Sequence, residues 1–125
     1  MCRLAILAAL LLAVPANAQQ PPSSAVSGSA STTSTAQTTL LSVPTGSRRL
    51  YITSVQCGRT DAGTSGITVT LNDDGSTIVV VPNSGGGGGN NMTFPTPLTI
   101  ATTLKFTPSS GVTTLYCNAQ GYAGN

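Results

Sequence analysis

Three groups of residues in this chain have types and spacings that could support chemistry: a run of glycines, two adjacent aspartates and two distant cysteines. The glycines lie in NSGGGGGNN at residues 83–91, directly after the apolar run TIVVVP. A phosphate-binding loop would place Lys and Ser or Thr directly after its glycines and would lead into a helix. Here two asparagines follow, and no Lys or Arg lies nearby. We therefore expect a solvent-exposed surface loop that connects two strands.

If this connection binds a partner, we expect backbone amides and the flanking asparagines to make the contacts. The ligand would be a protein or a glycan, and the sequence does not identify it further. The candidate binding loop consists of Asn83, Ser84, Gly85, Gly86, Gly87, Gly88, Gly89, Asn90 and Asn91.

The aspartates Asp73 and Asp74 lie in LNDDGST and could in principle bind calcium or act as an acid and a base. The calcium pattern D-x-[DN]-x-[DN]-G-x₅-E is absent. Neighbours in an extended chain point to opposite faces, whereas glycoside hydrolysis needs two carboxyl groups facing one cleft. The pair Asp74-Gly75 is instead typical of a tight hairpin turn. We expect a turn and no metal site.

Nucleophilic catalysis lacks its usual residues in this sequence. The chain has no His, and its three acidic residues are all Asp. A serine nucleophile would need Lys105 as its base, but Lys105 lies on the polar side of an alternating segment, where a solvated amine stays protonated. The sequence therefore predicts that the protein is not an enzyme and uses no cofactor. A small hydrolase with an unrecognised site is the remaining catalytic alternative.

The cysteines Cys57 and Cys117 are those left after Cys2, which lies in an expected signal peptide. An even number of cysteines in an exported protein predicts one disulfide. We expect it to join the second strand to the last across a sandwich. The alternative is two separate buried thiols.

The N-terminal segment MCRLAILAALLLAVPANA resembles a secretory signal peptide. Arg3 precedes an apolar stretch at residues 4–14, Pro15 breaks this stretch, and residues 16–18 have the small-x-small form of a cleavage site. The stretch is shorter than the roughly 20 residues that a membrane-spanning helix needs. We expect cleavage after Ala18, a secreted or periplasmic product, and no membrane span in the mature protein.

The mature chain expected from residue 19 onward is almost uncharged. Four basic residues and three acidic ones leave a net charge of +1 (four minus three), which provides no attraction to nucleic acid. The charged residues are Arg48, Arg49, Arg59 and Lys105, and Asp61, Asp73 and Asp74. We expect Thr, Ser, Asn and Gly to keep the surface soluble.

The elements that must position these residues are strands. Residues 19–36 are rich in Pro, Ser and Thr, and we expect a flexible arm whose later part could still be recruited as an edge strand. Residues 37–125 alternate apolar and polar residues between turn clusters, which predicts an all-β fold: a single antiparallel β-sandwich or jelly roll of about six or seven strands. The strands are expected near 38–43, 49–57, 66–72, 76–81, 92–100, 103–107 and 112–122.

Two of these strands carry more specific expectations. In the strand at 49–57, parity places Leu50 and Ile52 on one face, and Tyr51, Val55 and Cys57 on the other. The run TIVVVP at 77–82 is apolar on both faces, which favours a central strand that is covered on both sides.

The segments TTLLSVPTGSRRLYITSV, GITVTL, FPTPLTI and VTTLYCNAQGY together resemble small jelly-roll accessory modules of phage and prophage regions and their exported bacterial relatives. The resemblance covers about residues 37–122. It implies a jelly roll, binding to other surfaces and a possible homotrimer. The signal peptide and the disulfide depart from the intracellular versions of these modules.

These observations predict a secreted, non-catalytic β-sandwich that binds a surface or has a structural or accessory role. The first alternative is a self-assembling extracellular subunit, in which the strand at 77–81 or the Thr-rich arm pairs between copies.

Overall fold

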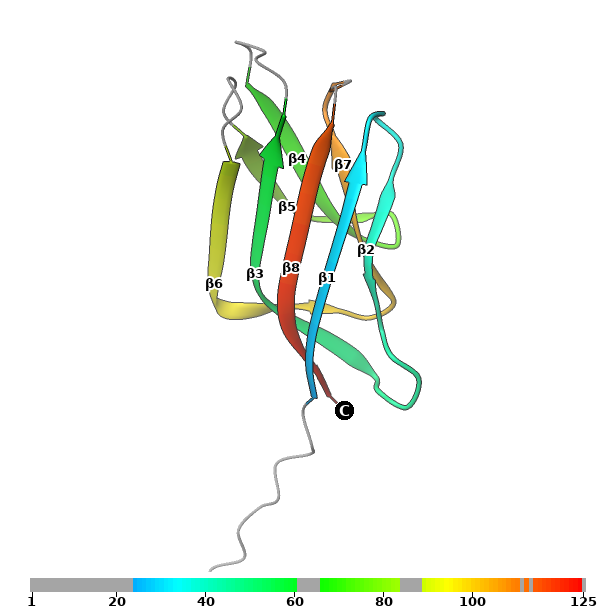
Figure 1. The fold of residues 1–125 in the computed structure, drawn as a ribbon. Coiled ribbons are helices and arrows are strands. Elements are labelled where there is room, and N and C mark those ends of the chain that lie inside the picture. The colour runs from blue at the N-terminus through cyan, green and yellow to red at the C-terminus, as the bar shows by residue number, and fades with distance from the viewer. Residues whose placement is uncertain (1–23, 61–65, 84–88, 111, 113, 125) are drawn as a thin grey trace, which may run out of the picture.

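The computed structural model describes residues 24–60, 66–83, 89–110, 112 and 114–124. They form two four-stranded sheets packed face to face (Figure 1). The strands are β1 (Ser24–Thr32), β2 (Thr38–Ser42), β3 (Arg49–Arg59), β4 (Ile67–Asp73), β5 (Ser76–Asn83), β6 (Gly89–Ile100), β7 (Thr103–Pro108) and β8 (Leu115–Gly124). No helix long and apolar enough to cross a membrane occurs among the described residues.

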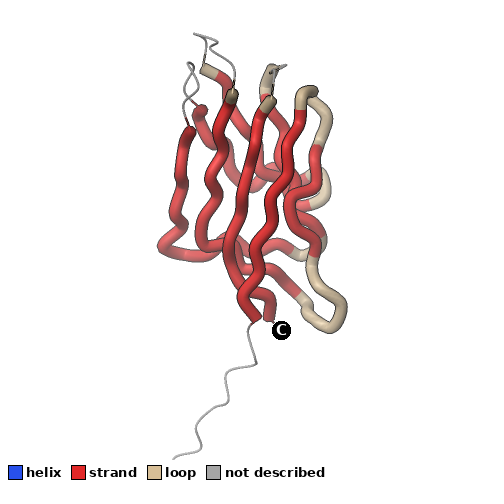
Figure 2. The backbone as a smooth tube through the Cα atoms, viewed as in Figure 1, coloured by secondary structure: helices blue, strands red, loops and turns tan. Residues whose placement is uncertain are grey.

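The strand order is that of a jelly roll. One sheet has the order β1-β8-β3-β6, here called sheet A, and the other has the order β2-β7-β4-β5, here called sheet B. All the pairings are antiparallel. Apart from the β4–β5 hairpin, each strand is followed in the chain by a strand of the other sheet, so the connections wind around the sandwich (Figure 2). The predicted all-β sandwich or jelly roll is confirmed.

The eighth strand, which makes the count one higher than expected, is β1. It lies within the segment 19–36, for which the sequence favoured a flexible arm, and it pairs along its whole length with β8, from Ser24 opposite Ala123 to Thr32 opposite Leu115. Its small residues suit an extended edge strand, and Val26 and Ala30 pack against the core. The later part of the arm is therefore the edge strand that the sequence had left open as an alternative to a free arm.

The core lies between the two sheets and follows the predicted alternation in β4 and β7. Ile67, Val69 and Leu71 are buried on β4, and Leu104 and Phe106 are buried on β7. Phe106 is the largest fully buried side chain. Burial of apolar side chains from both sheets is what holds them together.

The strand β3 departs from simple alternation because it contains a β-bulge between Ile52 and Ser54. The bulge adds one residue, Thr53, so the side chains beyond it change face. As a result Leu50, Ile52, Val55 and Cys57 all point into the core, although parity placed the first two opposite the last two.

The apolar strand β5 is an edge strand of sheet B, so the prediction of a central strand covered on both sides was wrong. Val81 is fully buried, but Ile78 and Val79 are only partly buried, and Val80 is 48% exposed. An apolar run shows that a segment favours extended structure, but it does not show which strands flank it.

Candidate functional site

The cysteines Cys57 and Cys117 form a disulfide with an S–S distance of 2.09 Å, so the alternative of two separate thiols was wrong. They lie directly opposite each other on the neighbouring strands β3 and β8, with their Cα atoms 4.2 Å apart. Both are fully buried. The bridge thus links two central strands of sheet A, and the prediction that it spans the sandwich was wrong. A disulfide of this kind is typical of proteins that mature in an oxidising compartment.

The candidate binding loop connects an edge strand of sheet B to an edge strand of sheet A. Asn83 ends β5, and residues 89–91 begin β6, while residues 84–88 lie outside the described part of the chain. The Asn90 amide donates a hydrogen bond to the Pro82 carbonyl at 2.5 Å, so this asparagine ties the two strands together. Asn91 is exposed on the outer face of sheet A, opposite Gln56. Ligand binding by the loop stays a prediction.

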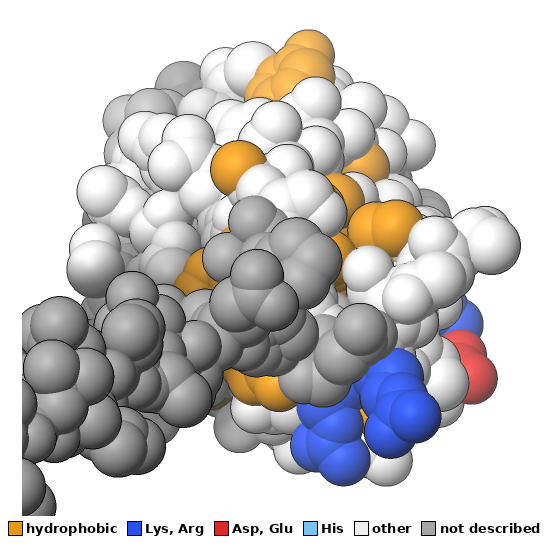
Figure 3. Space-filling model, turned by 90° about the horizontal axis from the view of Figure 1, so that it is seen from below, with side chains coloured by type: hydrophobic (Ala, Val, Ile, Leu, Met, Phe, Trp, Pro, Cys, Tyr) orange, Lys and Arg blue, Asp and Glu red, His pale blue; other side chains and the backbone are white. Residues whose placement is uncertain are grey.

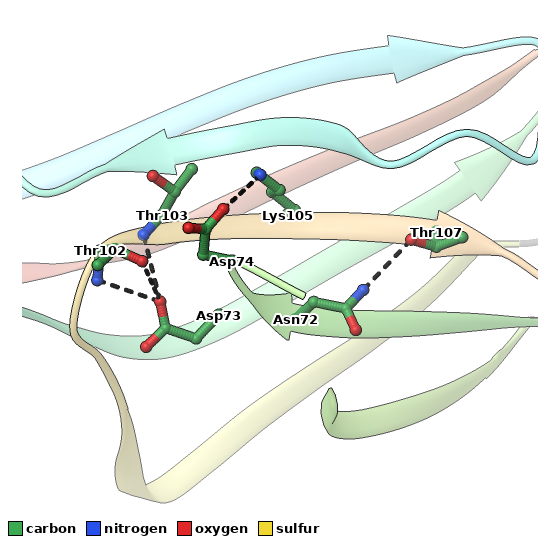
Figure 4. A network of polar contacts seen from close by, with 7 residues as sticks. All are labelled: Asn72, Asp73, Asp74, Thr102, Thr103, Lys105 and Thr107. Carbon is green, nitrogen blue, oxygen red and sulfur yellow. Dashed lines mark hydrogen bonds and ion pairs between the residues drawn. The ribbon is translucent and has the colours of Figure 1, made fainter. Parts of the chain in front are cut away.

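The aspartates occupy the β4–β5 hairpin, as predicted. Asp74 and Gly75 have φ angles of 45° and 104°, which are the left-handed conformations of a two-residue turn. The Asp73 carboxylate lies beside the β6–β7 connection (Figure 4). It accepts hydrogen bonds from the backbone N–H groups of Ala101 (2.7 Å), Thr102 (3.1 Å) and Thr103 (3.2 Å), and from the Thr102 hydroxyl (2.8 Å).

The charge state of Asp73 follows from these contacts. Burial raises the pKa of Asp73, but the hydrogen bonds from residues 101–103 lower it by more than burial raises it. The pKa therefore lies below its ordinary value of 3.8. Asp74 pairs with the Lys105 ammonium at 2.6 Å on the neighbouring strand β7. The two carboxylates therefore fix a turn and a connection between the sheets. Among the described residues, no group of three or more His, Cys, Asp or Glu side chains could hold a metal ion.

A buried polar residue beside this hairpin, Asn72, was not singled out from the sequence. The register of β4 and β5 shifts between Leu71 and Asn72, and Asn72 is 3% exposed. Its amide nitrogen lies 3.3 Å from the Thr70 carbonyl and 3.2 Å from the Thr107 hydroxyl, and its amide oxygen accepts from the Thr77 hydroxyl at 3.3 Å. The side chain is satisfied within the fold and acts structurally.

Asp73→Asn is expected to lower the free energy of unfolding at pH 7 by about 2 kcal/mol, because hydrogen bonds to a charged group are replaced by weaker ones. Because the folded-state pKa of Asp73 is lowered, its contribution is present above the unfolded-state pKa and is lost as pH falls through the folded-state value. Urea unfolding of both proteins at pH 7 and in strong acid should therefore show a gap that closes in acid.

The matched control is Asp74→Asn, which breaks the exposed ion pair with Lys105 and should cost less than about 1 kcal/mol. Equal losses for the two variants, or a gap for Asp73→Asn that is unchanged in acid, would contradict the role assigned to Asp73.

The outer face of sheet A carries polar side chains that are almost all uncharged. Outward-facing positions form rows across β1, β8, β3 and β6 in register, and apart from one alanine and two glycines their side chains are hydroxyls, amides and tyrosines. The rows contain Ala25, Tyr122, Tyr51 and Thr99; Ser27, Gln120, Ser54 and Thr93; Ser29, Asn118, Gln56 and Asn91; and Ser31, Tyr116, Gly58 and Gly89. No Lys, Arg or Asp occurs in these rows. The exposed Arg48 and Arg49 lie beyond one end.

Open hollows lie along this face between β1, β8 and β3. One has a volume of 440 Å³ and is lined by Ser27, Gly28, Ser29, Gln56, Asn118, Ala119 and Gln120. A second, of 500 Å³, is bordered by Ser29, Ser31, Tyr116 and Asn118 among others. Both share Ser29 and Asn118, so they form one continuous furrow. Seen from the end where the C-terminus lies, basic side chains gather at one margin, and hydrophobic side chains are scattered over the rest of the visible described surface, which is otherwise mostly uncharged (Figure 3).

No family model matches this chain, and no curated protein matches its sequence. Among solved structures, a chain of the cyanophage Pam1 capsid asymmetric unit is similar over 91% of this chain and 93% of its own length, with a TM-score of 0.51 and 15% identity. A chain of the disulfide-linked Bacillus endospore appendage pili is similar over 91% of this chain and 98% of its own length, with a TM-score of 0.49 and 15% identity.

A chain of the virus-like particle of the Macrobrachium rosenbergii extra small virus covers 98% of this chain and 96% of its own length, with a TM-score of 0.43 and 15% identity. The similarity to the capsid chain supports the fold, which agrees with the jelly roll implied by the resemblance to phage modules. The trimer and the surface binding that this resemblance also implied stay predictions.

Proposed function

We propose that this protein is an exported, non-catalytic structural module whose copies join edge to edge through β5. The observation that carries the proposal is the apolar edge strand itself: it is eight residues long, it carries no charge, and it exposes 48% of Val80. A long apolar edge strand offers unpaired backbone groups to another strand, and proteins that stay monomeric usually block such edges.

Two of the other edge strands, β6 and β2, carry devices that discourage pairing, and this contrast supports β5 as the joining edge. Pro95 and Pro97 lie within β6, where the register with β3 is interrupted. The strand β2 has only five residues and a bulge between Thr39 and Leu41. Proline, shortness and bulges each oppose the addition of another strand. In β5, Pro82 stands near the end, and the residues before it are Ile78 and three valines.

Pairing of β5 with the β5 of a second copy would be antiparallel about a two-fold axis and would produce a closed dimer. Val80 would then lie close to the same residue of the partner on the outer face of a continuous sheet. Cross-strand contacts between β-branched side chains stabilise such pairs. Export is supported by the predicted signal peptide at residues 1–18 and by the buried disulfide.

A non-catalytic role is supported by the engagement of the polar groups that could do chemistry. Asp73 holds the β6–β7 connection, Lys105 pairs with Asp74, and both cysteines are bridged. Of these groups, only Cys117 borders the furrow on sheet A, and its sulfur is bridged to Cys57.

Val80→Lys tests the assembly. Size-exclusion chromatography with light scattering should give twice the chain mass for the wild type and the single-chain mass for the variant, because the two lysines that face each other across the joint would repel. Thr93→Lys, which places the same charge on the edge strand β6 of sheet A, should remain a dimer.

A wild-type protein that is monomeric at the highest soluble concentration would overturn the proposal. So would a trimer or dimer whose mass is the same with Val80→Lys, because the contact would then lie elsewhere.

A further inference from the structure

We propose that the outer face of sheet A binds a neutral polysaccharide, laid along β8. This face belongs to the sheet opposite β5, so the inference goes beyond the proposed assembly and does not depend on it. The protein would then bind a polysaccharide in addition to pairing with a second copy of itself.

The side chains of the face match the chemistry of a sugar chain. Side-chain amides and hydroxyls each both donate and accept hydrogen bonds, as the hydroxyl groups of a sugar do. Along β8 the exposed amides Asn118 and Gln120 alternate with buried core residues, and Gln56 stands beside Asn118 on β3. These three amides line the 440 Å³ hollow, so they converge on a single space.

The furrow has its form because β1 contributes only small residues. Ser27, Ser29 and Ser31 face outward opposite Gln120, Asn118 and Tyr116 of β8. The longer side chains of β8 and β3 therefore stand above a floor of serines. The furrow depends on the pairing of β1 with β8, which joins residues of the N-terminal and C-terminal strands in one surface.

Tyrosines stand at both ends of the furrow. Tyr116 is 51% exposed at one end. Tyr51 and Tyr122 stack at the other end, with ring centroids 5.0 Å apart and an angle of 17° between the ring planes. Because a strand rises by about 3.4 Å per residue, Tyr116 and Tyr122 are separated by roughly 20 Å along β8. Aromatic rings with a polar hydroxyl suit a ligand that has both apolar faces and hydroxyl groups.

The absence of charge from the described rows selects a neutral partner. The rows hold no Lys or Arg to neutralise phosphates or uronic acids, and no carboxylate to attract a basic protein. Arg59 borders an adjoining hollow that shares Gln56 and Asn118 with the furrow, but its side chain is buried, with 8% exposed. The nearest exposed cations, Arg48 and Arg49, lie at the end of the furrow beyond Tyr51. An uncharged furrow should bind with little dependence on salt.

The test uses the mature protein and three neutral polysaccharides: dextran, mannan and hydroxyethyl cellulose. Affinity electrophoresis should show retardation by at least one of them, unchanged in 0.5 M NaCl. Replacing Asn118 and Gln120 together by alanine should weaken this binding by at least about tenfold. Thr68→Ala on the outer face of sheet B is the matched control and should bind as the wild type does, with thermal melts confirming that all the proteins fold.

The proposal is overturned if none of the three polymers retards the folded wild type, or if the double variant binds as well as the wild type. Retardation only by anionic alginate, abolished by salt, would also overturn it and would point to the arginines. The variant Val80→Lys should retain polysaccharide binding, so failure of the assembly proposal would be distinguishable from failure of this one.

Discussion

Replacing Cys57 and Cys117 together by alanine should lower the free energy of unfolding by about 4 kcal/mol, the value that the chain-entropy model gives for their sequence separation of 60 residues. For a domain of this size, the loss corresponds to a melting temperature lower by roughly 15 °C or more. Both sulfurs are fully buried, so the variant also loses some core packing. Thermal and urea unfolding of the two mature proteins provide the measurement.

Reduced wild-type protein separates the cross-link from the packing. It keeps both sulfur atoms in the core but lacks the bond, and it should lie close to the double variant in stability if the cross-link dominates. A thiol count under denaturing, non-reducing conditions should find no free thiol in the mature protein. Two free thiols, or a double variant that melts with the wild type, would refute the stabilising bridge.

The disulfide also bears on the proposed polysaccharide furrow. Gln56 and Asn118 are the sequence neighbours of the two cysteines and are paired with each other across β3 and β8. The bridge on the inner face of sheet A therefore holds these two amides in register on its outer face. Reduction should weaken polysaccharide binding as well as stability. The proposed joint at β5 should be affected less directly, because β5 lies in the other sheet.

Gly121→Ala should lower the free energy of unfolding by about 3 kcal/mol, at the upper end of the cost of overpacking, because the clash is with backbone. A Cβ atom at Gly121 would collide with the Tyr51 carbonyl and would lie 3.0 Å from the Cα atom of Ile52. This site faces the β3 bulge, where Ile52 lies opposite Gly121. Two central strands would have to separate to admit a methyl group.

Gly58→Ala is the matched control, because it lies on the same pair of strands but its nearest neighbour would be 3.8 Å away. It should change the urea midpoint by much less than Gly121→Ala. Similar midpoints for the two variants would show that the strands do not approach at Gly121 as closely as described.

Much of the fold was predictable because it depends on local patterns. Alternation in β4 and β7 identified the buried residues of those strands, including Val69, Leu71 and Phe106. Asp74-Gly75 identified the hairpin because few other residue pairs adopt two consecutive left-handed conformations. The cysteine count predicted the disulfide. The export signal and the binding role of the glycine loop stay predictions from the same kind of reasoning.

The features that the sequence left undecided all depend on which strands become neighbours. The bulge at Thr53 reverses the parity of β3, and it arises from the pairing of β3 with β8 and β6. Cys57 and Cys117 lie in one sheet because β8 inserts between β1 and β3. The furrow exists because β1 was recruited next to β8.

The same distinction explains the two proposals. By itself, the sequence determined that the chain forms alternating strands, closes one disulfide and carries almost no charge, since these follow from residue types and short-range spacing. Only the tertiary structure decided that β5 lies at an edge and that Gln56, Asn118 and Gln120 share one hollow. The physical reason is that strand order results from burying the apolar faces of all the strands together, a condition that no single segment can satisfy or encode.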